Sequence, residues 1–303
     1  MKDLRKWLEP CRLCPRHCGT GRLSGERGRC GVSAVLKVAR AALHMWEEPC
    51  ISGTQGSGTV FFSGCPLHCV YCQNRMISGG QAGKEISVGR LAEIFLELQG
   101  KGAQNINLVT PTHYIPQILD ALRTAKAKGL ILPVVFNCGG YETPEALRLM
   151  EGSADIYLTD FKYMESVTAG KYSFAPDYPE RAKEALDEMV RQCPQPVFSD
   201  GGMMKKGVIV RHLLLPGRVA EAKAVVRYVH ERYGDQVYLS LMNQYTPFEE
   251  LRGKYPEICR KVTAREYGAL VDYALELGVE RGFIQEGETA GESFIPAFDY
   301  EGV

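Results

Sequence analysis

Three cysteines lie close together near the end of the first quarter of the chain, with the spacing C-x3-C-x2-C: Cys65, Cys69 and Cys72. Four cysteine thiolates normally hold a four-iron cluster. Three thiolates leave one iron without a protein ligand, and an incomplete coordination shell can bind a substrate or cofactor. The alternative from spacing alone is a zinc site completed by His68 or by a more distant residue. This three-cysteine loop, residues 65–72, is therefore a candidate metal centre with one open position.

A second set of cysteines precedes this loop, with the spacing C-x2-C-x3-C-x11-C: Cys11, Cys14, Cys18 and Cys30. Arginines lie among them, and cationic neighbours favour the thiolate form that binds metals. Four thiolates are enough for a closed site, which would hold either a structural zinc or a second [4Fe–4S] cluster able to relay electrons. Three closely spaced cysteines with a distant fourth are more typical of a cluster than of zinc knuckles. We call this set the N-terminal cysteine group.

The overall composition excludes several classes of protein. The 303 residues include 36 basic and 36 acidic side chains, and 45% are hydrophobic, as in an ordinary globular protein. No run of about 18 apolar residues could form a membrane-spanning helix. Zero net charge disfavours a nucleic-acid partner. The start of the chain has no apolar signal core, so we expect the cytoplasm, where metal ligation explains eleven cysteines better than disulfides do.

The first part of the chain differs from the rest in its pattern. Residues 1–55 are rich in cysteine, glycine, proline and arginine and have little periodicity, which predicts a metal-binding extension ordered by its metal. From residue 56 to residue 303, short apolar runs alternate with helical apolar spacing, as in βαβ units with a parallel sheet.

The expected strands are residues 59–63, 105–109, 132–136, 155–159, 208–215, 237–241 and 282–285. The expected helices are residues 88–102, 114–128, 179–191, 220–233 and 263–277, with another that begins at Pro144 after the N-cap Thr143. Six such units and a terminal strand predict an α/β fold, namely a partial (β/α)6 TIM-type barrel with a small cysteine-rich N-terminal extension.

In barrels of this kind the chemistry lies at the carboxyl ends of the strands. The expected strands place several polar residues at or just beyond these ends: Thr110, Pro111, Thr112, Asn137, Asp160, Lys162 and Arg211. The pair Asp160 and Lys162 could equally be a structural ion pair. His113 is either a proton-transfer or substrate-contact residue, or a hydrogen-bonded structural histidine.

The string Phe-Phe-Ser-Gly-Cys-Pro-Leu-His-Cys-Val-Tyr-Cys-Gln-Asn, residues 61–74, has an aromatic residue, Tyr71, before its last cysteine. At the end of a first strand, this string resembles the radical S-adenosylmethionine (SAM) superfamily, and most closely its pyruvate formate-lyase activating enzyme-like branch. The resemblance covers roughly residues 55–290. The N-terminal cysteine group resembles an extension of some uncharacterised members of that branch.

The resemblance implies a [4Fe–4S] cluster held by Cys65, Cys69 and Cys72, with SAM bound at the open iron. The cluster would cleave SAM and release a 5′-deoxyadenosyl radical that abstracts hydrogen from a substrate. It also implies cofactor contacts from the residues at matching positions. Tyr71 would lie near the adenine, and Asn74 is a further expected cofactor contact. Those at the strand ends are Thr110, Pro111, Thr112, Asn137, Asp160, Lys162 and Arg211.

Two of these motifs depart from the family pattern. Residues 110–112 stand where many members carry a Gly-Gly-Glu-type motif for the SAM amino group, and Asn137 stands where activating enzymes have an acid. Asp160 and Lys162, in contrast, match the Asp-Leu-Lys motif, and Arg211 matches the fifth-strand pattern.

The branch resemblance suggests hydrogen abstraction from a glycine α-carbon, which activates a glycyl-radical enzyme. The alternatives are modification of a peptide, a nucleoside or a small molecule, or, in a different class, a non-catalytic iron–sulfur electron carrier. The carrier is disfavoured because it would not need six strand-end loops. The expected partners are an electron donor such as flavodoxin or ferredoxin and a protein or small-molecule substrate. No membrane is expected as a partner.

Overall fold

The computed structural model describes residues 4–285 and 296–303. Its centre is a sheet in which seven strands run parallel, and each is hydrogen-bonded to the next. From one side of the sheet to the other they are β2 (Ser57–Phe62), β4 (Ile106–Val109), β5 (Val134–Cys138), β6 (Ile156–Asp160), β8 (Met204–Leu213), β9 (Tyr238–Met242) and β10 (Gly282–Ile284). In the part of the chain that is described, β10 and β3 (Lys84–Ile86) are the two ends of the sheet, so the barrel is open. The predicted α/β fold is confirmed.

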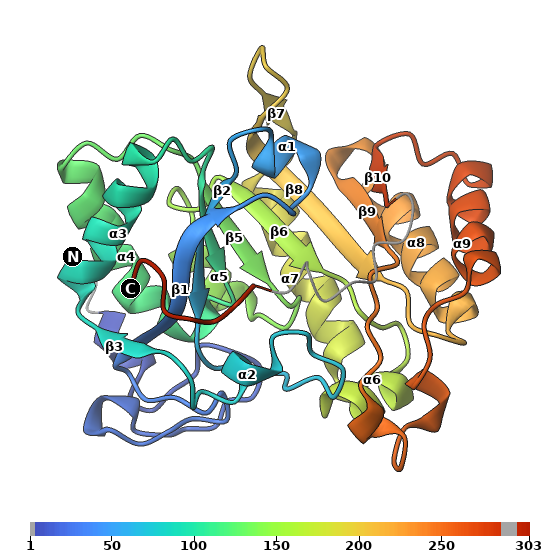
Figure 1. Cartoon of the computed structure of the whole chain (residues 1–303), viewed down its shortest axis with the longest axis horizontal. Helices are drawn as coiled ribbons and strands as arrows, with labels where there is room; N and C mark the ends of the chain where they lie inside the picture. Colours follow the sequence, from blue (N-terminus) through green and yellow to red (C-terminus); the bar gives the residue numbers. More distant parts are fainter. Residues whose placement is uncertain (1–3, 286–295) are drawn as a thin grey trace.

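The helices that connect these strands lie at the sides and back of the sheet (Figure 1). The main ones are α3 (Val88–Gly100), α4 (Ile115–Ala127), α5 (Pro144–Leu149), α7 (Tyr178–Gln192), α8 (Val219–Tyr233) and α9 (Ala264–Glu276). Shorter ones are α1 (Pro49–Ser52), α2 (Arg75–Ser78) and α6 (Ser166–Ser173). The predicted caps are present: the Thr143 side chain accepts a hydrogen bond from the Ala146 amide, and Thr263 forms a capping box with Glu266.

Short 3-10 turns complete the described elements: Leu4–Trp7, Arg22–Ser24, Thr112–Tyr114, Gly234–Gln236, Glu249–Leu251 and Pro256–Ile258. The parallel strands β4 and β5 are buried along their whole length, as expected for strands covered on both faces. Helix α3 packs through a stripe of Leu91, Ile94, Phe95 and Leu98, the spacing that marked it in the sequence.

Three observed strands were not expected from the sequence: β1 (Leu36–His44), β3 and β7 (Val197–Phe198). Strand β1 (Leu36–His44) lies in the region assigned to the extension, yet it pairs antiparallel with β2 and, on its other edge, with β3. It therefore belongs to the same sheet as the barrel strands. The two-residue strand β7 (Val197–Phe198) pairs with β8 in a hairpin that projects from the body of the molecule (Figure 1). A domain boundary at residue 55 stays a prediction.

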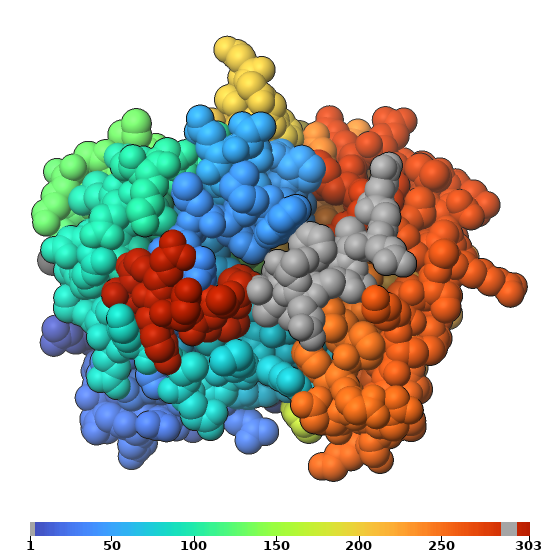
Figure 2. Space-filling view, viewed as in Figure 1, coloured from blue at the N-terminus to red at the C-terminus, as the bar shows by residue number. Residues whose placement is uncertain are grey.

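Both ends of the described chain pack against this sheet. The N-terminal residues Leu8, Leu13 and Val32 are buried in the main hydrophobic core. The C-terminal segment, residues 296–303, crosses β1, where the Ala41 amide donates a hydrogen bond to the Glu301 carbonyl at 2.8 Å. Figure 2 shows this segment on the surface of the molecule, over β1. Among the described residues, the helices are all too short or too polar to cross a membrane.

A buried carboxylic acid lies just beyond β5. Glu142 is 1% exposed and accepts a hydrogen bond from the Thr112 hydroxyl at 2.9 Å, and its second oxygen has no hydrogen-bond partner among the described residues. Burial raises the pKa of Glu142 to about 7, from 4.5 for an ordinary glutamate. The folded protein therefore binds this proton more tightly than the unfolded chain does.

This difference predicts a pH dependence of stability. The stabilising contribution is fully present below pH 4.5 and is lost as the pH rises through about 7, a change of about 3 kcal/mol in the free energy of unfolding. We expect Glu142→Gln, which keeps the hydrogen bond from Thr112, to remove this part of the fall between about pH 5 and about pH 8 in urea unfolding. The exposed Glu145→Gln is the matched control. Parallel pH profiles for wild type and Glu142→Gln would contradict the prediction.

Candidate metal and cofactor site

A cleft of about 620 Å³ opens at the carboxyl ends of the parallel strands. Its wall is made by the segment after β1, by the three-cysteine loop and by the ends of β5, β6, β8, β9 and β10. The residues that carry charge or can bind metal in this wall are His44, Glu47, Glu48, Cys69, Cys72, Asp160, Lys162 and Arg211. The strand-end rule thus located the cleft correctly.

The three-cysteine loop follows β2 directly and presents two of its sulfur atoms to the cleft. Cys69 and Cys72 line the cleft, and all three cysteines are free and half-buried. The Ser173 hydroxyl donates a hydrogen bond to Cys69 Sγ at 2.9 Å, and the Leu67 amide donates to Cys65 Sγ at 3.4 Å. Hydrogen bonds to sulfur of this kind stabilise bound thiolate.

The buried environment of these sulfur atoms disfavours the thiolate form unless a cation binds. Burial raises the pKa of Cys65 to about 11 and that of Cys72 to about 12, so both are protonated at neutral pH unless a bound cation replaces the proton. No three cysteine, histidine, aspartate or glutamate side chains in residues 4–285 and 296–303 are placed to hold a single metal ion. A cluster differs because each thiolate binds its own iron. Three free thiols on one loop are a donor set that fits an iron–sulfur cluster with one open position.

His68, the alternative fourth ligand of a zinc site, is hydrogen-bonded to the N-terminal segment. Its Nε2 lies 2.8 Å from the Arg29 carbonyl in the N-terminal segment. His113 is 2% exposed and its Nε2 lies 2.8 Å from the Ser63 carbonyl. Burial lowers the pKa of His113 to about 3, so this ring is neutral and hydrogen-bonded within the core.

Arg211 is at the centre of a charged network on the cleft wall. Its guanidinium donates to Asp160 Oδ1 at 3.0 Å, to Asn137 Oδ1 at 2.7 Å and to Glu47 Oε2 at 3.1 Å. Lys162 donates to the other oxygen of Asp160. Although burial works against ionisation, Lys162 and Arg211 hold the pKa of Asp160 below its usual value. Four of the predicted site residues are thus brought together.

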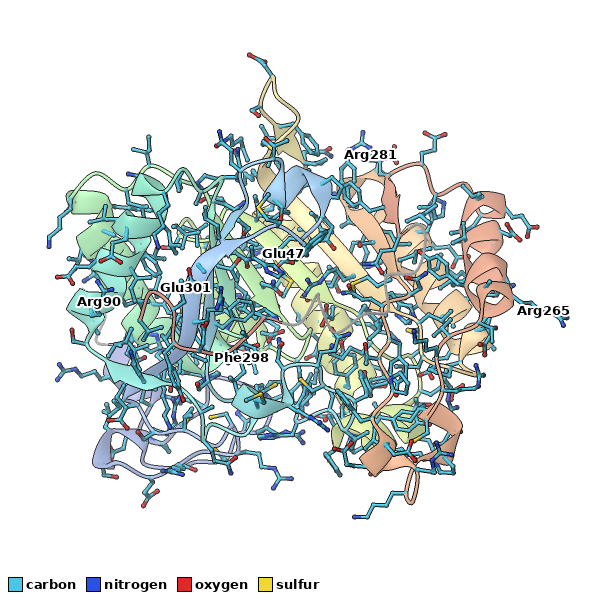
Figure 3. The ribbon with its side chains drawn as sticks, in the orientation of Figure 1. Glu47, Arg90, Arg265, Arg281, Phe298 and Glu301 are labelled. Carbon is cyan, nitrogen blue, oxygen red and sulfur yellow. The ribbon has the colours of Figure 1, made fainter. Side chains whose placement is uncertain are left out.

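Glu47 is a cleft residue that sequence analysis missed. It follows β1 and lies over the middle of the parallel strands (Figure 3). The Glu47 Oε1 also accepts a hydrogen bond from the side-chain amide (Nδ2) of Asn107 at 3.0 Å. Burial raises the pKa of Glu47 and of its neighbour Glu48, while Arg211 opposes the rise. The adjacent acids Glu47 and Glu48, shortly after β1, are the sequence signal that could have pointed to this position.

Tyr71 lines the cleft, and its hydroxyl ends a chain of hydrogen bonds. The Tyr71 hydroxyl lies 2.6 Å from that of Tyr163, which lies 2.7 Å from the Ser173 hydroxyl. Because Ser173 donates to Cys69 Sγ, the chain is polarised toward the sulfur. Asn74 also lines the cleft, two residues after Cys72.

The predicted site residues after β4 lie outside the wall of the cleft. Thr110, Pro111 and Thr112 do not line the cleft, and Pro111 and Thr112 are buried. Thr110 has a positive φ of 56°, unusual for a β-branched residue, which marks a tight turn at this strand end. Their role in cofactor binding stays a prediction.

The N-terminal cysteine group lies against the three-cysteine loop. The Cys65 amide donates a hydrogen bond to the Cys30 carbonyl at 3.1 Å. Arg16 donates to the carbonyls of Pro66, Ser173 and Phe174, and so joins this segment to both sides of the loop. Cys11, Cys14 and Cys30 are buried, and Cys18 is exposed.

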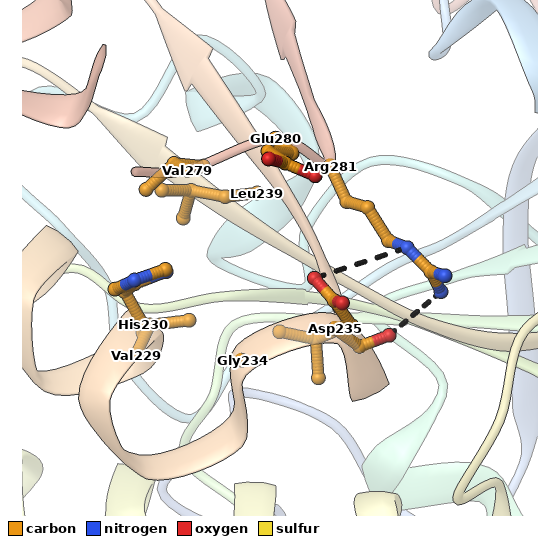
Figure 4. Close-up of a pocket in the computed structure, with 9 residues that line it drawn as sticks. Val229, His230, Gly234, Asp235, Leu239, Val279, Glu280 and Arg281 are labelled. Carbon is orange, nitrogen blue, oxygen red and sulfur yellow. Dashed lines mark hydrogen bonds and ion pairs between the residues drawn. The ribbon is translucent and has the colours of Figure 1, made fainter. Parts of the chain in front are cut away.

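A second, much smaller hollow lies at the opposite ends of the strands. It is lined by the end of α8 and by residues that precede β9 and β10, and Arg281 there pairs with Asp235 (Figure 4). Neither cysteine group borders it. We therefore take the cleft, and not this hollow, as the candidate site.

Comparisons with known proteins agree with this location. The family model of the radical SAM superfamily matches residues 59–213, which include the three-cysteine loop and the strands through β8. An uncharacterised protein of Methanocaldococcus jannaschii is 29% identical over 276 residues, which are 88% of this chain and 73% of that protein.

Solved structures give a further comparison, at low sequence identity. The FeFe-hydrogenase maturase HydG from Carboxydothermus hydrogenoformans has a TM-score of 0.50 at 11% identity, over 78% of this chain and 56% of that one. Streptococcus suis SuiB, bound to its precursor peptide SuiA, has a TM-score of 0.48 at 14% identity, over 74% of this chain and 46% of that one. This chain therefore spans about half the length of each.

The family model covers half of the chain, and its match contains the cysteine loop and most of the charged wall of the cleft. The chain belongs to the radical SAM superfamily, and this membership implies a [4Fe–4S] cluster and SAM.

Proposed function

We propose that Cys65, Cys69 and Cys72 bind a [4Fe–4S] cluster in the wall of the cleft, and that the cleft binds SAM and a substrate beside it. The observation that carries this proposal is that one loop carries three half-buried thiols, two of which, Cys69 and Cys72, line a cleft formed by the strand ends. When bound, the cluster supplies the electron that cleaves SAM to a 5′-deoxyadenosyl radical, which abstracts hydrogen from the substrate.

The side chains of the cleft wall divide this work. Lys162 is held by Asp160 and also interacts electrostatically with the thiolates of Cys69 and Cys72, so it offsets the negative charge of a thiolate-bound cluster. Asp160 and Asn137 fix the orientation of Arg211, which then presents a rigid cation to the carboxylate or ribose of SAM. We assign Tyr71 and Asn74 to the adenine end, and residues 110–112 to backbone support at the methionine end.

The apolar side chains in the cleft wall exclude water from the reacting atoms. Trp46, Phe61 and Phe283 are among the residues that line the cleft. A carbon-centred radical would react with unintended groups if it were mobile, so tight packing around the substrate is needed.

We further propose that the substrate is the α-carbon of a glycine in a glycyl-radical enzyme and that the electron comes from a flavodoxin- or ferredoxin-type carrier. The string at residues 61–74 supports this choice by its resemblance to activating enzymes. The N-terminal cysteine group is proposed as a second metal site, a [4Fe–4S] cluster or zinc, in the extension of residues 1–55.

The central prediction concerns the three-cysteine loop. Protein reconstituted without oxygen and given dithionite and SAM is expected to form 5′-deoxyadenosine, because the reduced cluster donates the electron. Alanine at Cys65, Cys69 or Cys72 removes a ligand and should lower this rate at least about 100-fold, with loss of about four iron atoms per chain. The control, Cys259→Ser, lies outside both cysteine groups and should keep the rate. A wild-type protein with bound cluster and no 5′-deoxyadenosine would overturn the proposal.

A second prediction concerns how Asp160 positions its two cations. In Asp160→Asn, Arg211 and Lys162 lose a charged partner, and SAM binding should weaken roughly 10- to 100-fold, the effect of one charge-assisted hydrogen bond. Iron content should not change, since Asp160 is not a cluster ligand. Equilibrium dialysis with labelled SAM measures the affinity, and Asp235→Asn, at the second hollow, is the control. Unchanged affinity would remove Asp160 from the SAM site.

A third prediction tests the substrate. Incubation with a glycyl-radical enzyme of the source organism, SAM and a reductant should produce a glycyl radical, seen by electron paramagnetic resonance. The same partner with alanine at its radical-bearing glycine should give no signal, because the alanine side chain blocks the abstraction. If 5′-deoxyadenosine forms while the partner stays diamagnetic, glycine is not the substrate, and the radical SAM proposal itself is unaffected.

A further inference from the structure

A buried cation lies within the N-terminal cysteine group. Arg22 is 1% exposed, and its guanidinium donates to the carbonyls of Ser33 and His113, each at 2.6 Å. Its Nη1 lies 3.8 Å from Cys11 Sγ, and its Nε has no hydrogen-bond partner among the described residues. None of the ion pairs found in the described chain involves Arg22, so no carboxylate there neutralises it.

This charge requires an anion nearby. Removing a guanidinium from water costs several kcal/mol unless an opposite charge compensates it, and carbonyl groups carry only partial charges. Besides these carbonyls, Arg22 approaches the Cys11 sulfur and the face of the Tyr114 ring, whose centroid lies 5.6 Å from the guanidinium carbon. Neither a neutral thiol nor an aromatic ring carries a full negative charge. A metal centre with four thiolate ligands carries net negative charge and would supply the missing anion.

The fold of the segment gathers its cysteines, and their spacing favours an iron–sulfur cluster over a single zinc ion. The Cys11 amide bonds to the Thr20 carbonyl and the Gly19 amide to the Cys11 carbonyl, which closes the loop that carries Cys14 and Cys18. A Cβ on Gly28 would lie 3.4 Å from Cys30 Sγ and 3.5 Å from Cys18 Sγ, so both sulfur atoms lie against bare backbone. Three closely spaced cysteines with a distant fourth are also more typical of a cluster than of paired zinc knuckles.

The group is joined to the three-cysteine loop by short polar contacts. Besides the hydrogen bond from Cys65 to Cys30, the His68 ring bonds to the Arg29 carbonyl, and Arg16 Nε donates to the Pro66 carbonyl at 2.8 Å. Gly64 has a φ of 92°, and a Cβ there would lie 2.7 Å from the Cys30 carbonyl oxygen. The close approach of the two backbones therefore requires glycine.

The group also reaches the surface. Cys18 is exposed, whereas Cys69 and Cys72 face the cleft. Most of the exposed charged residues interleaved with these cysteines are basic: Arg12, Arg27 and Arg29 are exposed, against one exposed acid, Glu26. A basic surface over a redox centre fits a carrier protein with an acidic face.

We infer that the N-terminal cysteine group binds an iron–sulfur cluster with Arg22 as its buried counter-charge, and that this cluster is where electrons enter the protein. An acidic one-electron carrier is oxidised at this surface and reduces the N-terminal cluster by one electron. That electron then passes across the Cys30–Cys65 contact to the centre held by the three-cysteine loop. The relay rests on the proposed function, whereas the identity of the N-terminal metal does not.

The first experiment identifies the metal. In the variant Cys65→Ala/Cys69→Ala/Cys72→Ala, reconstituted with iron, sulfide and zinc all present, we expect about four iron and about four sulfide per chain. Dithionite should bleach its visible absorption. Further substitution of Cys14 by serine should lower the iron, while Cys259→Ser should not. One zinc per chain, or no metal, would overturn the inference even if the wild type is active with SAM.

The second experiment tests the route of the electron. In Arg27→Glu/Arg29→Glu, 5′-deoxyadenosine formation supported by a reduced flavodoxin or ferredoxin should fall at least about tenfold, because an acidic carrier is repelled. Formation supported by dithionite should stay within about twofold of wild type, because this small reductant does not need the surface. The exposed Arg265→Glu on the other side of the molecule is the control.

Two results would overturn the relay: an equal loss with carrier and with dithionite, or no loss with either. Cys18→Ser provides a second variant that does not depend on the docking surface, since it changes the exposed ligand itself. It should show the same selective loss with the carrier. Folding of each variant is checked by its urea unfolding midpoint.

Discussion

The half-buried guanidinium of Arg211 needs compensating groups, and this requirement orders the wall of the cleft. Its partners are Asp160 at the end of β6, Asn137 in β5 and Glu47 in the segment after β1. Each hydrogen bond fixes one strand end relative to the others. Because Asp160 also holds Lys162, the same network sets the position of the cation that faces the thiols. Through Asp160, the Arg211 guanidinium thereby connects the strand ends to the cation beside the three-cysteine loop.

The thiols of the three-cysteine loop need a compensating positive charge, whereas Arg211 needs negative ones. Burial keeps Cys65 and Cys72 protonated until a metal supplies positive charge, so occupancy of the loop and ionisation of its ligands are coupled. Ser173 donates to one sulfur from α6, and Arg16 holds the same region from the N-terminal segment. The loop is therefore supported from both sides by groups distant in the sequence. This support prepares the site before any metal binds.

Much of the fold was predictable because its signals are local. Alternating apolar runs and helical spacing identified the parallel strands and the main helices, and the capping box at Thr263 marked the start of α9. Strand β1 was not recognised because charged Lys37 and Arg40 interrupt its apolar residues, so the strand lacks a continuous apolar run. Its antiparallel pairing with β2 on one edge and β3 on the other is a tertiary feature. Its omission placed Glu47 outside the expected site.

The sequence by itself determined the two cysteine spacings, the alternation of strands and helices, and the polar residues at the strand ends. Tertiary structure alone decided that Glu47 pairs with Arg211, 164 positions away, and that Cys30 touches Cys65. Spacing and periodicity report only what neighbouring residues do along one element. The tertiary assembly of the sheet decides which distant segments meet. It therefore decides which groups neutralise the charge of Arg211 and whether the two cysteine groups come into contact.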